Sequence, residues 1–420
     1  MQLNPRILAF ADWYLPGQNG GGAVTAIANV IELLGDEYGF YVYTRDRDSG
    51  EKRRYEGIRG ERWKRVGKAE VFYASKPSLR SVRRRIREVE PDIIYLNSFF
   101  SRLTVETLLL RKLGVLPGAA IVVAPRGEFS PGALGLKGFR KWIYRKVAFA
   151  GGLYRDVTWQ ASSKLEEEQV RAMIAGGGAG NGGRVVLAPD VPSPGLWEVR
   201  AGATRPKKRR GAVRLVFLSR IARMKNLHFA LEMAGLAEGE IELDIYGPVE
   251  DEGYWEECRE RMRGLPSSVR VRYRGAVAQE EVAKVFGEYH FQLLPTLGEN
   301  FGYVIVEALA AGCPVVMSDE TPWRGLREKA AGWDLPLGER EKWREAIAEC
   351  VRMNEEEYRE ISRGARRYFE EWMAEASYRS GTVELFEKAM GKEGMREEAV
   401  VAGKDATLKG GATKAAGAGS

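Results

Sequence analysis

The sequence has few of the residues on which many catalytic centres depend. Its 420 residues include only two histidines and three cysteines. This scarcity argues against a histidine-rich metal site, and a Ser-His-Asp hydrolase would need His228 or His290 as its base. We interpret both histidines as structural, because one lies early in a predicted helix and the other directly precedes a predicted strand. Three widely spaced cysteines do not suit a disulfide framework, and they favour a reducing, cytoplasmic environment.

Long apolar runs are also missing. No segment approaches the roughly 20 consecutive apolar residues that span a bilayer. The first 15 residues lack the basic segment and apolar stretch of a secretory signal, so we expect none. Hydrophobic residues make up 44% and charged residues 29% of the chain, which excludes a largely disordered protein. At about 150 residues per domain, the length predicts two or three domains.

Positive charge is concentrated in the first half of the chain. Residues 1–200 hold 31 Lys and Arg against 21 Asp and Glu, whereas residues 201–420 hold 34 against 37. Most of the excess lies in residues 51–87, and part of that stretch, 78–90, is predicted to form an arginine-rich amphipathic helix. Three interpretations stay open for it: a solvated surface helix, a patch for anionic lipid or an anionic acceptor, and nucleic-acid binding.

Strand and helix signals alternate along the chain. Strand candidates in the first half are residues 6–11, 40–44, 92–97, 120–124, 157–161 and 185–188. Those in the second half are residues 213–218, 241–246, 269–273, 291–295 and 314–317. Apolar strands that alternate with helices are typical of parallel doubly wound sheets, so we expect an α/β fold with two Rossmann-like domains facing a central cleft.

The same alternation places the domain boundaries. Residues 1–200 are expected to form the first domain and residues 211–367 the second. A linker containing Pro192, Pro194 and the basic run 205–210 is expected between them. Residues 400–420, which are rich in Gly, Ala, Lys and Thr, are expected to be disordered.

Two groups of residues suggest a nucleotide-linked substrate. Gly20, Gly21 and Gly22 follow the first strand and precede the first helix, where glycine lets the backbone approach an anion at the helix N-terminus. A flexible turn accounts for them equally well. Arg220 and Lys225 stand at the two ends of a strand-to-helix loop in the second half, an arrangement that suits a diphosphate. The alternative for this pair is two solvated surface cations.

A third group runs from Glu299 to Glu307. Glu299 is expected at the exit of a strand, near the ligand side. Glu307 is expected two turns into an apolar helix, where a carboxylate needs hydrogen-bond donors such as ribose hydroxyls. Asn300 and the N–H groups of Phe301 and Gly302 are expected to cap this helix, where a phosphate can bind. An ion pair within the protein is the alternative for the two acids.

These motifs bear a resemblance to a known family. Residues 213–324 resemble the nucleotide-sugar domain of the family 4 retaining glycosyltransferases, which have the GT-B fold. The matching segments are FLSRI at 217–221 with Lys225 and Asn226, IYGP at 245–248, LPTLGENFG at 294–302, VEAL at 306–309, AGCPV at 311–315 and TPW at 321–323. A weaker resemblance includes residues 20–22 and 125–132 and extends to about residue 390.

The resemblance implies roles for individual residues. Arg220 and Lys225 would bind the donor diphosphate, Glu307 its ribose and Glu299 the transferred sugar. The loop from Gly20 to Gly22 would approach the phosphates or the acceptor. The matching positions expected on the donor-binding side are Gly247, Asn300, Phe301 and Gly302. Transfer would retain the anomeric configuration and require neither a metal nor another cofactor. A final helix over about 368–390, with Trp372 as its anchor, would cross back to the first domain.

One position departs from the family pattern. Many members carry a histidine near the reacting sugar, but this chain has none before residue 228, and Arg126 takes that place. Arginine stays charged near neutral pH and is no base, so Arg126 would bind a phosphate or a charged acceptor. Glu128 would orient the acceptor hydroxyl or serve as the base. Asp46 and Asp48 have the Asp-x-Asp spacing of a different glycosyltransferase fold, and we interpret them as part of a solvated loop.

The sequence therefore predicts a cytoplasmic retaining glycosyltransferase. It would move a sugar from a nucleotide-diphosphate donor to a polysaccharide, lipid-linked or small-molecule acceptor, with peripheral contact to an anionic membrane and no nucleic-acid partner. One alternative is another GT-B enzyme such as a nucleotide-sugar epimerase, which would convert the donor without an acceptor. The other is a non-enzymatic basic module that binds nucleic acid or a membrane surface, which would show no nucleotide affinity.

Overall fold

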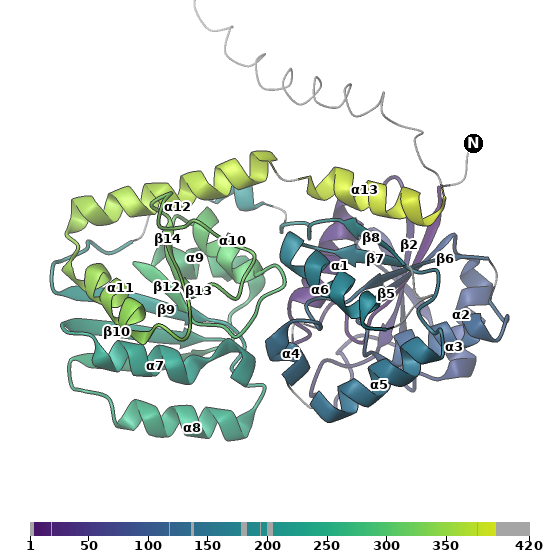
Figure 1. Ribbon diagram of the computed structural model, residues 1–420, viewed down its shortest axis with the longest axis horizontal. Helices are drawn as coiled ribbons and strands as arrows, with labels where there is room; N and C mark the ends of the chain where they lie inside the picture. The colour runs from purple at the N-terminus through teal and green to yellow at the C-terminus, as the bar shows by residue number, and fades with distance from the viewer. Residues whose placement is uncertain are drawn as a thin grey trace, which may run out of the picture.

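Two α/β lobes lie side by side in the computed structural model (Figure 1). It describes residues 4–17, 19–116, 118–135, 138–177, 183–193, 195–199, 205–375 and 377–391. Pro194 and the expected disordered tail, 400–420, lie outside these residues. The expected α/β fold with two Rossmann-like sheets is confirmed.

The first lobe is built on an eight-stranded sheet with the order β3-β4-β2-β1-β5-β6-β7-β8. Its strands are β1 (Arg6–Phe10), β2 (Gly39–Arg45), β3 (Trp63–Val66), β4 (Ala69–Ala74), β5 (Ile93–Asn97), β6 (Ala120–Ala124), β7 (Thr158–Ala161) and β8 (Arg184–Leu187). Neighbouring strands are parallel except β3 and β4. Every residue of the central strand β5 is buried, because helices cover both faces of a parallel sheet.

Within the described residues, six helices of the first half of the chain belong to this lobe. They are α1 (Gly22–Leu34), α2 (Leu79–Val89), α3 (Arg102–Lys112), α4 (Pro131–Gly135), α5 (Gly138–Ala150) and α6 (Lys164–Ala175). The side chains of Ser78, Ser101 and Ser163 accept hydrogen bonds from N–H groups in the first turns of α2, α3 and α6, which fixes where these helices begin. The basic segment 51–87 also contains the antiparallel β3–β4 pair, which the sequence did not predict.

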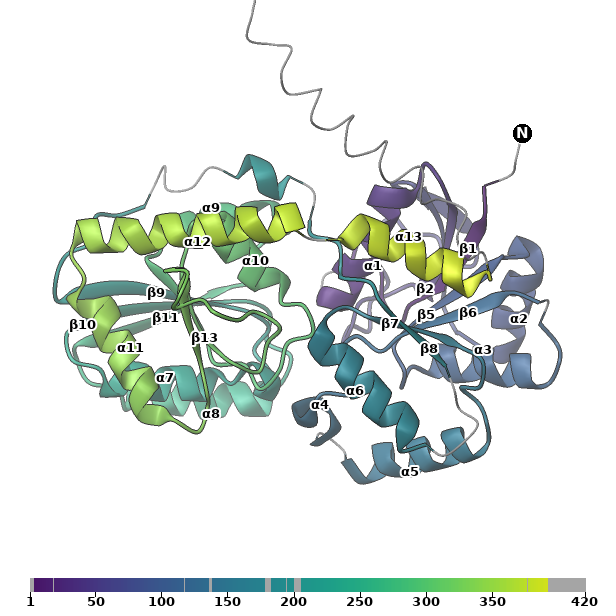
Figure 2. The ribbon, with the colours of Figure 1, turned by 45° about the horizontal axis from the view of Figure 1, so that its top comes forward.

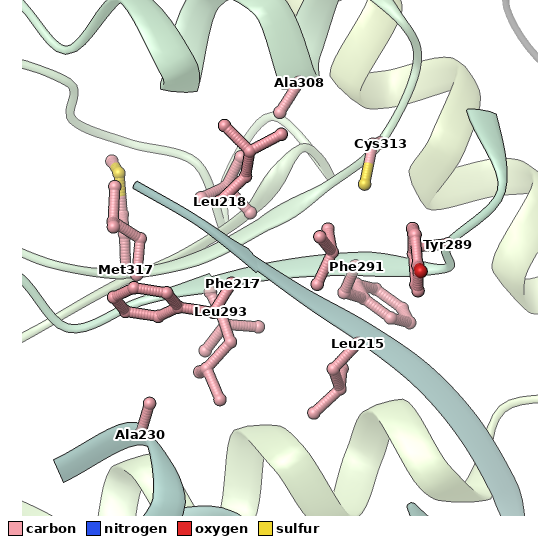
Figure 3. Packing of buried hydrophobic residues seen from close by; sticks show 14 of the residues in the cluster. Leu215, Phe217, Leu218, Ala230, Tyr289, Phe291, Leu293, Ala308, Cys313 and Met317 are labelled. Atoms are coloured by element: carbon pink, nitrogen blue, oxygen red, sulfur yellow. The ribbon is translucent and has the colours of Figure 1, made fainter. Parts of the chain in front are cut away.

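The second lobe carries a six-stranded, fully parallel sheet with the order β11-β10-β9-β12-β13-β14. Its strands are β9 (Ala212–Leu218), β10 (Glu240–Tyr246), β11 (Val269–Gly275), β12 (Phe291–Leu294), β13 (Val315–Ser318) and β14 (Gly332–Leu335). Its helices are α7 (Leu227–Leu236), α8 (Glu252–Arg263), α9 (Val282–Gly287), α10 (Tyr303–Ala310) and α11 (Arg340–Arg352). Phe217 of β9 and Leu293 of β12 are fully buried in its core (Figure 3).

The basic run 205–210 belongs to the second lobe and is not a free linker. Arg205 donates to the carbonyls of Ala311 and Gly312 at 2.9 and 2.8 Å. Lys208 is 3% exposed, and its Nζ donates to the carbonyls of Val351 and Met353 at 3.1 and 2.9 Å. A buried ammonium needs such acceptors, which residue composition alone does not reveal. Burial lowers the pKa of Lys208 to about 8.

Two helices, and not one, connect the second lobe back to the first. The helix α12 (Glu355–Glu375) packs against α10, whereas α13 (Tyr378–Ala389) packs on β6, β7 and β8 (Figure 2). The expected single helix over 368–390 is therefore divided. Trp372 packs within the second lobe, with its ring centroid 4.9 Å from that of Trp323, so it anchors α12 there. In the first lobe the corresponding anchor is Phe386, whose ring lies 5.7 Å from that of Tyr95.

Candidate active site

A narrow crevice separates the lobes where the carboxyl ends of their strands face each other. Residues of both lobes line it: Gly127, Ser130, Ser163, Leu165, Glu166, Gln169, Gly298, Glu299, Asn300 and Glu320. The lobes approach closely here, since a Cβ atom added to Gly127 would lie 2.9 Å from Cβ of Asn300. This edge of a doubly wound sheet is where such folds bind ligands.

The glycine loop of the first lobe reaches a predicted cation of the second. Gly21 has a φ of 63° and precedes α1, and a Cβ atom added there would lie 3.2 Å from Nε of Arg220. Gly22 faces Tyr303, with 3.5 Å between its added Cβ and the ring, whereas Gly20 packs within its own lobe against Trp13. The structure therefore brings the loop and Arg220 together.

Both predicted cations are paired with acids. Arg220 follows β9 and forms an ion pair with Glu250, which follows β10. Lys225 ends the short 3-10 helix η2 (Arg223–Lys225) and forms an ion pair with Glu299. The side chains of Lys225 and Glu299 are each only 11% exposed. The predicted diphosphate-binding lysine and the predicted sugar-binding acid are thus direct neighbours.

The start of α10 differs from the expected cap. Gly302, with a φ of 81°, is the N-cap residue, and no side chain caps the helix. Oδ1 of Asn300 is buried without a hydrogen-bond partner in the described structure, so it does not form the predicted cap. Phe301 is 5% exposed, with its ring packed against those of Trp323 and Trp372. Its contribution to a ligand would therefore come from its backbone.

Glu307 is the most strongly buried of the predicted donor-binding acids. It lies in α10 with 5% of its surface exposed, and Nε2 of Gln279 donates to its Oε1 at 2.5 Å. Gln279 belongs to η3 (Gln279–Glu281). Burial raises the pKa of Glu307 to about 7, although the bond from Gln279 lowers it somewhat. A carboxylate this costly to ionise favours ligands that donate hydrogen bonds to it.

Gly247 lets the backbone after β10 pack closely against the backbone after β9, just before Arg220. It has a φ of 133°, and an added Cβ atom would lie 1.9 Å from the carbonyl oxygen of Ser219. Its N–H donates to the carbonyl of Gly275 at 2.9 Å. Only glycine lets the ends of β9 and β10 approach this closely, and Arg220 follows directly on one of them.

Arg126 is held in a buried network of the first lobe. It has a φ of 55° and forms an ion pair with Asp190. Its Nη2 donates to the hydroxyl of Tyr95 at 2.5 Å and to Oδ1 of Asn97 at 2.8 Å. Burial lowers the pKa of Arg126, but the combined attraction of Asp190 and the neighbouring Tyr95, Tyr303 and Glu166 outweighs it and leaves that pKa raised. These partners give Arg126 a positioning role for the loop between β6 and α4.

Glu128 accepts hydrogen bonds from the loop between β5 and α3. Its Oε1 accepts from Oγ of Ser98 at 2.7 Å, and its Oε2 accepts from the N–H groups of Phe99 and Phe100 at 2.5 and 3.3 Å. Burial raises the pKa of this carboxyl, and the hydrogen bonds oppose the rise. Both oxygens therefore stabilise the start of α3, a contact set that favours a structural role over that of an acceptor base.

Sequence reasoning missed two acids that line the crevice, Glu166 and Glu320. Glu166 of α6 is 3% exposed and accepts from the backbone N–H of Gly127 at 2.7 Å and of Ser162 at 2.8 Å. The S-x-x-E spacing from Ser163 to Glu166 signals the start of a helix. Its carboxylate, however, reaches the loop after β6, and no local pattern indicates that contact.

The Asp-x-Asp pair is not a solvated loop. Asp46 is fully buried and forms ion pairs with Arg47 and Arg54 at 2.9 Å each. Asp48 accepts from the backbone N–H of Asn19 at 3.0 Å. Within the part of the chain that the structure describes, no three His, Cys, Asp or Glu side chains are grouped to hold a metal. No helix among the described residues is long and apolar enough to cross a bilayer.

Comparison with known proteins agrees with this arrangement. Residues 212–353 match the family model described as glycosyl transferases group 1, about a third of the chain. The matched residues lie in the second lobe, and the first lobe lies outside the match. A curated relative, phosphatidyl-myo-inositol mannosyltransferase of Mycobacterium leprae (strain TN), is 33% identical over 127 residues, which cover 29% of this chain and 33% of that relative. The match thus spans about a third of the curated relative's length.

Solved structures resemble nearly the whole chain. Sucrose-phosphate synthase from Thermosynechococcus elongatus has a TM-score of 0.67 at 16% identity, covering 92% of this chain and 99% of its own. Anabaena Alr3699/HepE, solved with UDP and glucose, has a TM-score of 0.61 at 16% identity, covering 96% and 100%. At such identities the likeness shows the fold, which is GT-B. The family match and the curated relative support enzyme activity of the glycosyltransferase class.

Proposed function

We propose that this protein is a retaining glycosyltransferase that uses a nucleoside-diphosphate sugar. The observation that carries the proposal is the grouping of Arg220, Lys225, Glu299 and Glu307 at one edge of a group 1 domain. Each of the two cations forms an ion pair with an acid, so each already lies beside a negative charge. In the proposal the diphosphate supplies such a charge. A carboxylate that needs donors lies in the adjoining helix α10.

In this proposal the residues divide the donor among them. Arg220 and Lys225 bind the diphosphate and stabilise the charge that develops on it as the glycosidic bond breaks. The N-terminus of α10 adds free N–H groups, and these charges account for the leaving group without a metal. Glu307 accepts from both ribose hydroxyls, in place of the bond from Gln279. Glu299 accepts from a hydroxyl of the transferred sugar while it holds Lys225.

Related structures and names support this assignment at the level of class. Anabaena Alr3699/HepE was solved with UDP-glucose, and the Mycobacterium leprae relative is named a mannosyltransferase. The proposal includes no cofactor beyond the nucleotide-sugar substrate. Polysaccharide, lipid-linked and small-molecule glycoside acceptors remain the candidate classes, and a place in the synthesis of cell-envelope polysaccharide is part of the proposal.

The test has a binding part and a product part. Thermal shift with UDP, GDP and ADP should identify one nucleotide that raises Tm. At ten times its Kd this nucleotide should raise the free energy of unfolding by about 1.4 kcal/mol. The matching nucleotide sugars, incubated with each acceptor class, should yield a product with the donor's anomeric configuration, as NMR of its anomeric proton would show. Conversion of the donor without an acceptor would instead identify an epimerase. An inverted product would overturn the retaining assignment.

A further inference from the structure

We infer that the outer face of α5 docks this protein on an anionic lipid bilayer. Helix α5 lies on the outside of the first lobe, away from α13 (Figure 1). Four large apolar side chains of this one helix are exposed: Phe139 by 75%, Trp142 by 52%, Ile143 by 41% and Val147 by 68%. Their i, i+3, i+4 and i+8 spacing places them on one side of the helix. A soluble surface rarely gathers apolar side chains in this way.

Other side chains of α5 hold the helix in the lobe. Phe149 is 4% exposed, and the hydroxyl of Tyr144 lies 2.7 Å from that of Tyr154. Nζ of Lys141 donates to the carbonyl of Ala133 at 2.5 Å and lies 5.0 Å from the ring centroid of Phe100. The helix therefore cannot roll to bury its outer face without breaking these contacts.

Charge identifies the partner. From residue 129 to residue 155 the chain has no Asp or Glu, and its six basic residues are Lys137, Arg140, Lys141, Arg145, Lys146 and Arg155. Arg140 and Lys146 are exposed beside the apolar residues. Aromatic and aliphatic side chains flanked by Lys and Arg are the pattern of a helix that lies in the interface of an anionic bilayer.

The end of α3 lies beside the end of α5. Nζ of Lys112 donates to the carbonyl of Gly151, directly after α5, at 2.5 Å. In α3 and just beyond it, Leu109 is 42% and Leu113 is 70% exposed. These exposed leucines therefore lie near the C-terminal end of α5.

This assignment differs from the one that the sequence suggested. Helix α2 buries Val82, Ile86 and Val89, and its exposed face consists mainly of arginines. Such a face can attract anionic lipid, but it has little apolar surface to insert. The docking surface on α5 is independent of the proposed glycosyl transfer, since none of its residues lines the crevice.

Flotation of the full-length protein with vesicles tests the inference. We expect binding to vesicles of equal parts phosphatidylcholine and phosphatidylglycerol, no binding to phosphatidylcholine alone, and weaker binding as salt rises. The double variant Phe139→Ser, Trp142→Ser and the double variant Arg140→Glu, Lys146→Glu should each weaken binding about tenfold or more. The matched control, Arg83→Glu with Arg84→Glu on α2, makes the same change in charge and should retain most binding.

Each outcome decides the matter. The four substituted residues of α5 are exposed, so both double variants should have an unchanged Tm without vesicles. A loss of vesicle binding would then not be caused by a loss of folding. Wild-type protein that does not bind the anionic vesicles, or α5 variants that bind like wild type, would overturn the inference. So would light scattering that shows a wild-type dimer and a Phe139→Ser, Trp142→Ser monomer, because a second copy would then be the occupant.

Discussion

Lys225 and Glu299 form an ion pair inside the crevice, with both side chains nearly buried. The pair joins the end of η2 to the loop after β12, two segments that are 74 residues apart in the chain. If Lys225 binds the donor diphosphate, it must do so while Glu299 partly neutralises it. The two residues should therefore have opposite effects on nucleotide binding.

Replacing Glu299→Gln should separate binding from transfer. The variant leaves the charge of Lys225 uncompensated, so we expect the affinity for the nucleoside diphosphate to rise by up to about fivefold. The transfer rate should fall, because the amide holds neither the sugar hydroxyl nor the lysine in the same way. Lys225→Ala should lower kcat/KM by about a hundredfold or more. Titration calorimetry and initial rates measure the two effects, and a Glu299→Gln protein that loses nucleotide affinity would contradict this account.

Glu307 should make donor binding depend on pH. Burial raises its pKa to about 7, so the carboxylate that accepts from both ribose hydroxyls forms as pH rises through this value. Between about pH 6 and about pH 8 the affinity for a nucleotide sugar should rise about tenfold. A nucleotide sugar is the right probe, because the terminal phosphate of a free diphosphate itself titrates near pH 6. Glu307→Gln should bind more weakly and lose this pH dependence.

The same residue makes a prediction about stability. The folded pKa of about 7 lies above the ordinary 4.5, so the folded protein holds this proton more tightly than the unfolded chain. The stabilisation from Glu307 is complete below the ordinary pKa and is lost as pH rises to about 7, by about 3 kcal/mol in total. Above pH 7, Glu307→Gln should therefore unfold at higher denaturant concentration than wild type. Equal midpoints at high pH would show that Glu307 ionises without cost.

Arg126 and Asp190 should be coupled in stability. Asp190→Ala leaves a buried guanidinium without its counter-charge and should cost about 3–5 kcal/mol. Removing both charges, with Arg126→Met and Asp190→Ala together, should recover part of this loss because no unpaired charge remains. Denaturant midpoints of the two single variants and the double variant complete the cycle. Strictly additive losses would mean that the ion pair contributes nothing specific.

The sequence predicted much of the sheets and less of their edges. Strands such as β5 and β9 are apolar runs that a parallel sheet buries on both faces, so their pattern is visible without a structure. In the β3–β4 pair, β3 reads Trp-Lys-Arg-Val and its two middle residues are exposed, so it carries no such signal. Helix α5 was also not identified from the sequence. Its apolar side faces outward and is not buried against a sheet.

The site shows the same division. Motif spacing singled out Arg220, Lys225, Glu299 and Glu307 as candidates, because each lies within one strand-loop-helix unit. Their partners could not be found in this way. Glu250 lies 30 residues from Arg220, and Gln279 lies 28 residues from Glu307. Contacts of this range are set by the order of strands in the sheet, and neither partner belongs to a local pattern that marks it.

Gly247 offers a test of the backbone that supports Arg220. An alanine there would place Cβ 1.9 Å from the carbonyl oxygen of Ser219 and would need a φ of 133°, which side-chain-bearing residues rarely adopt. Gly247→Ala should therefore cost about 3 kcal/mol or more, or prevent folding. Gly253→Ala is the matched control, because Gly253 lies in α8 with its added Cβ no closer than 3.5 Å to another atom. It should be neutral or stabilise by up to about 1 kcal/mol. Thermal melts compare the two variants, and a Gly247→Ala protein with wild-type Tm would show that the ends of β9 and β10 can separate freely.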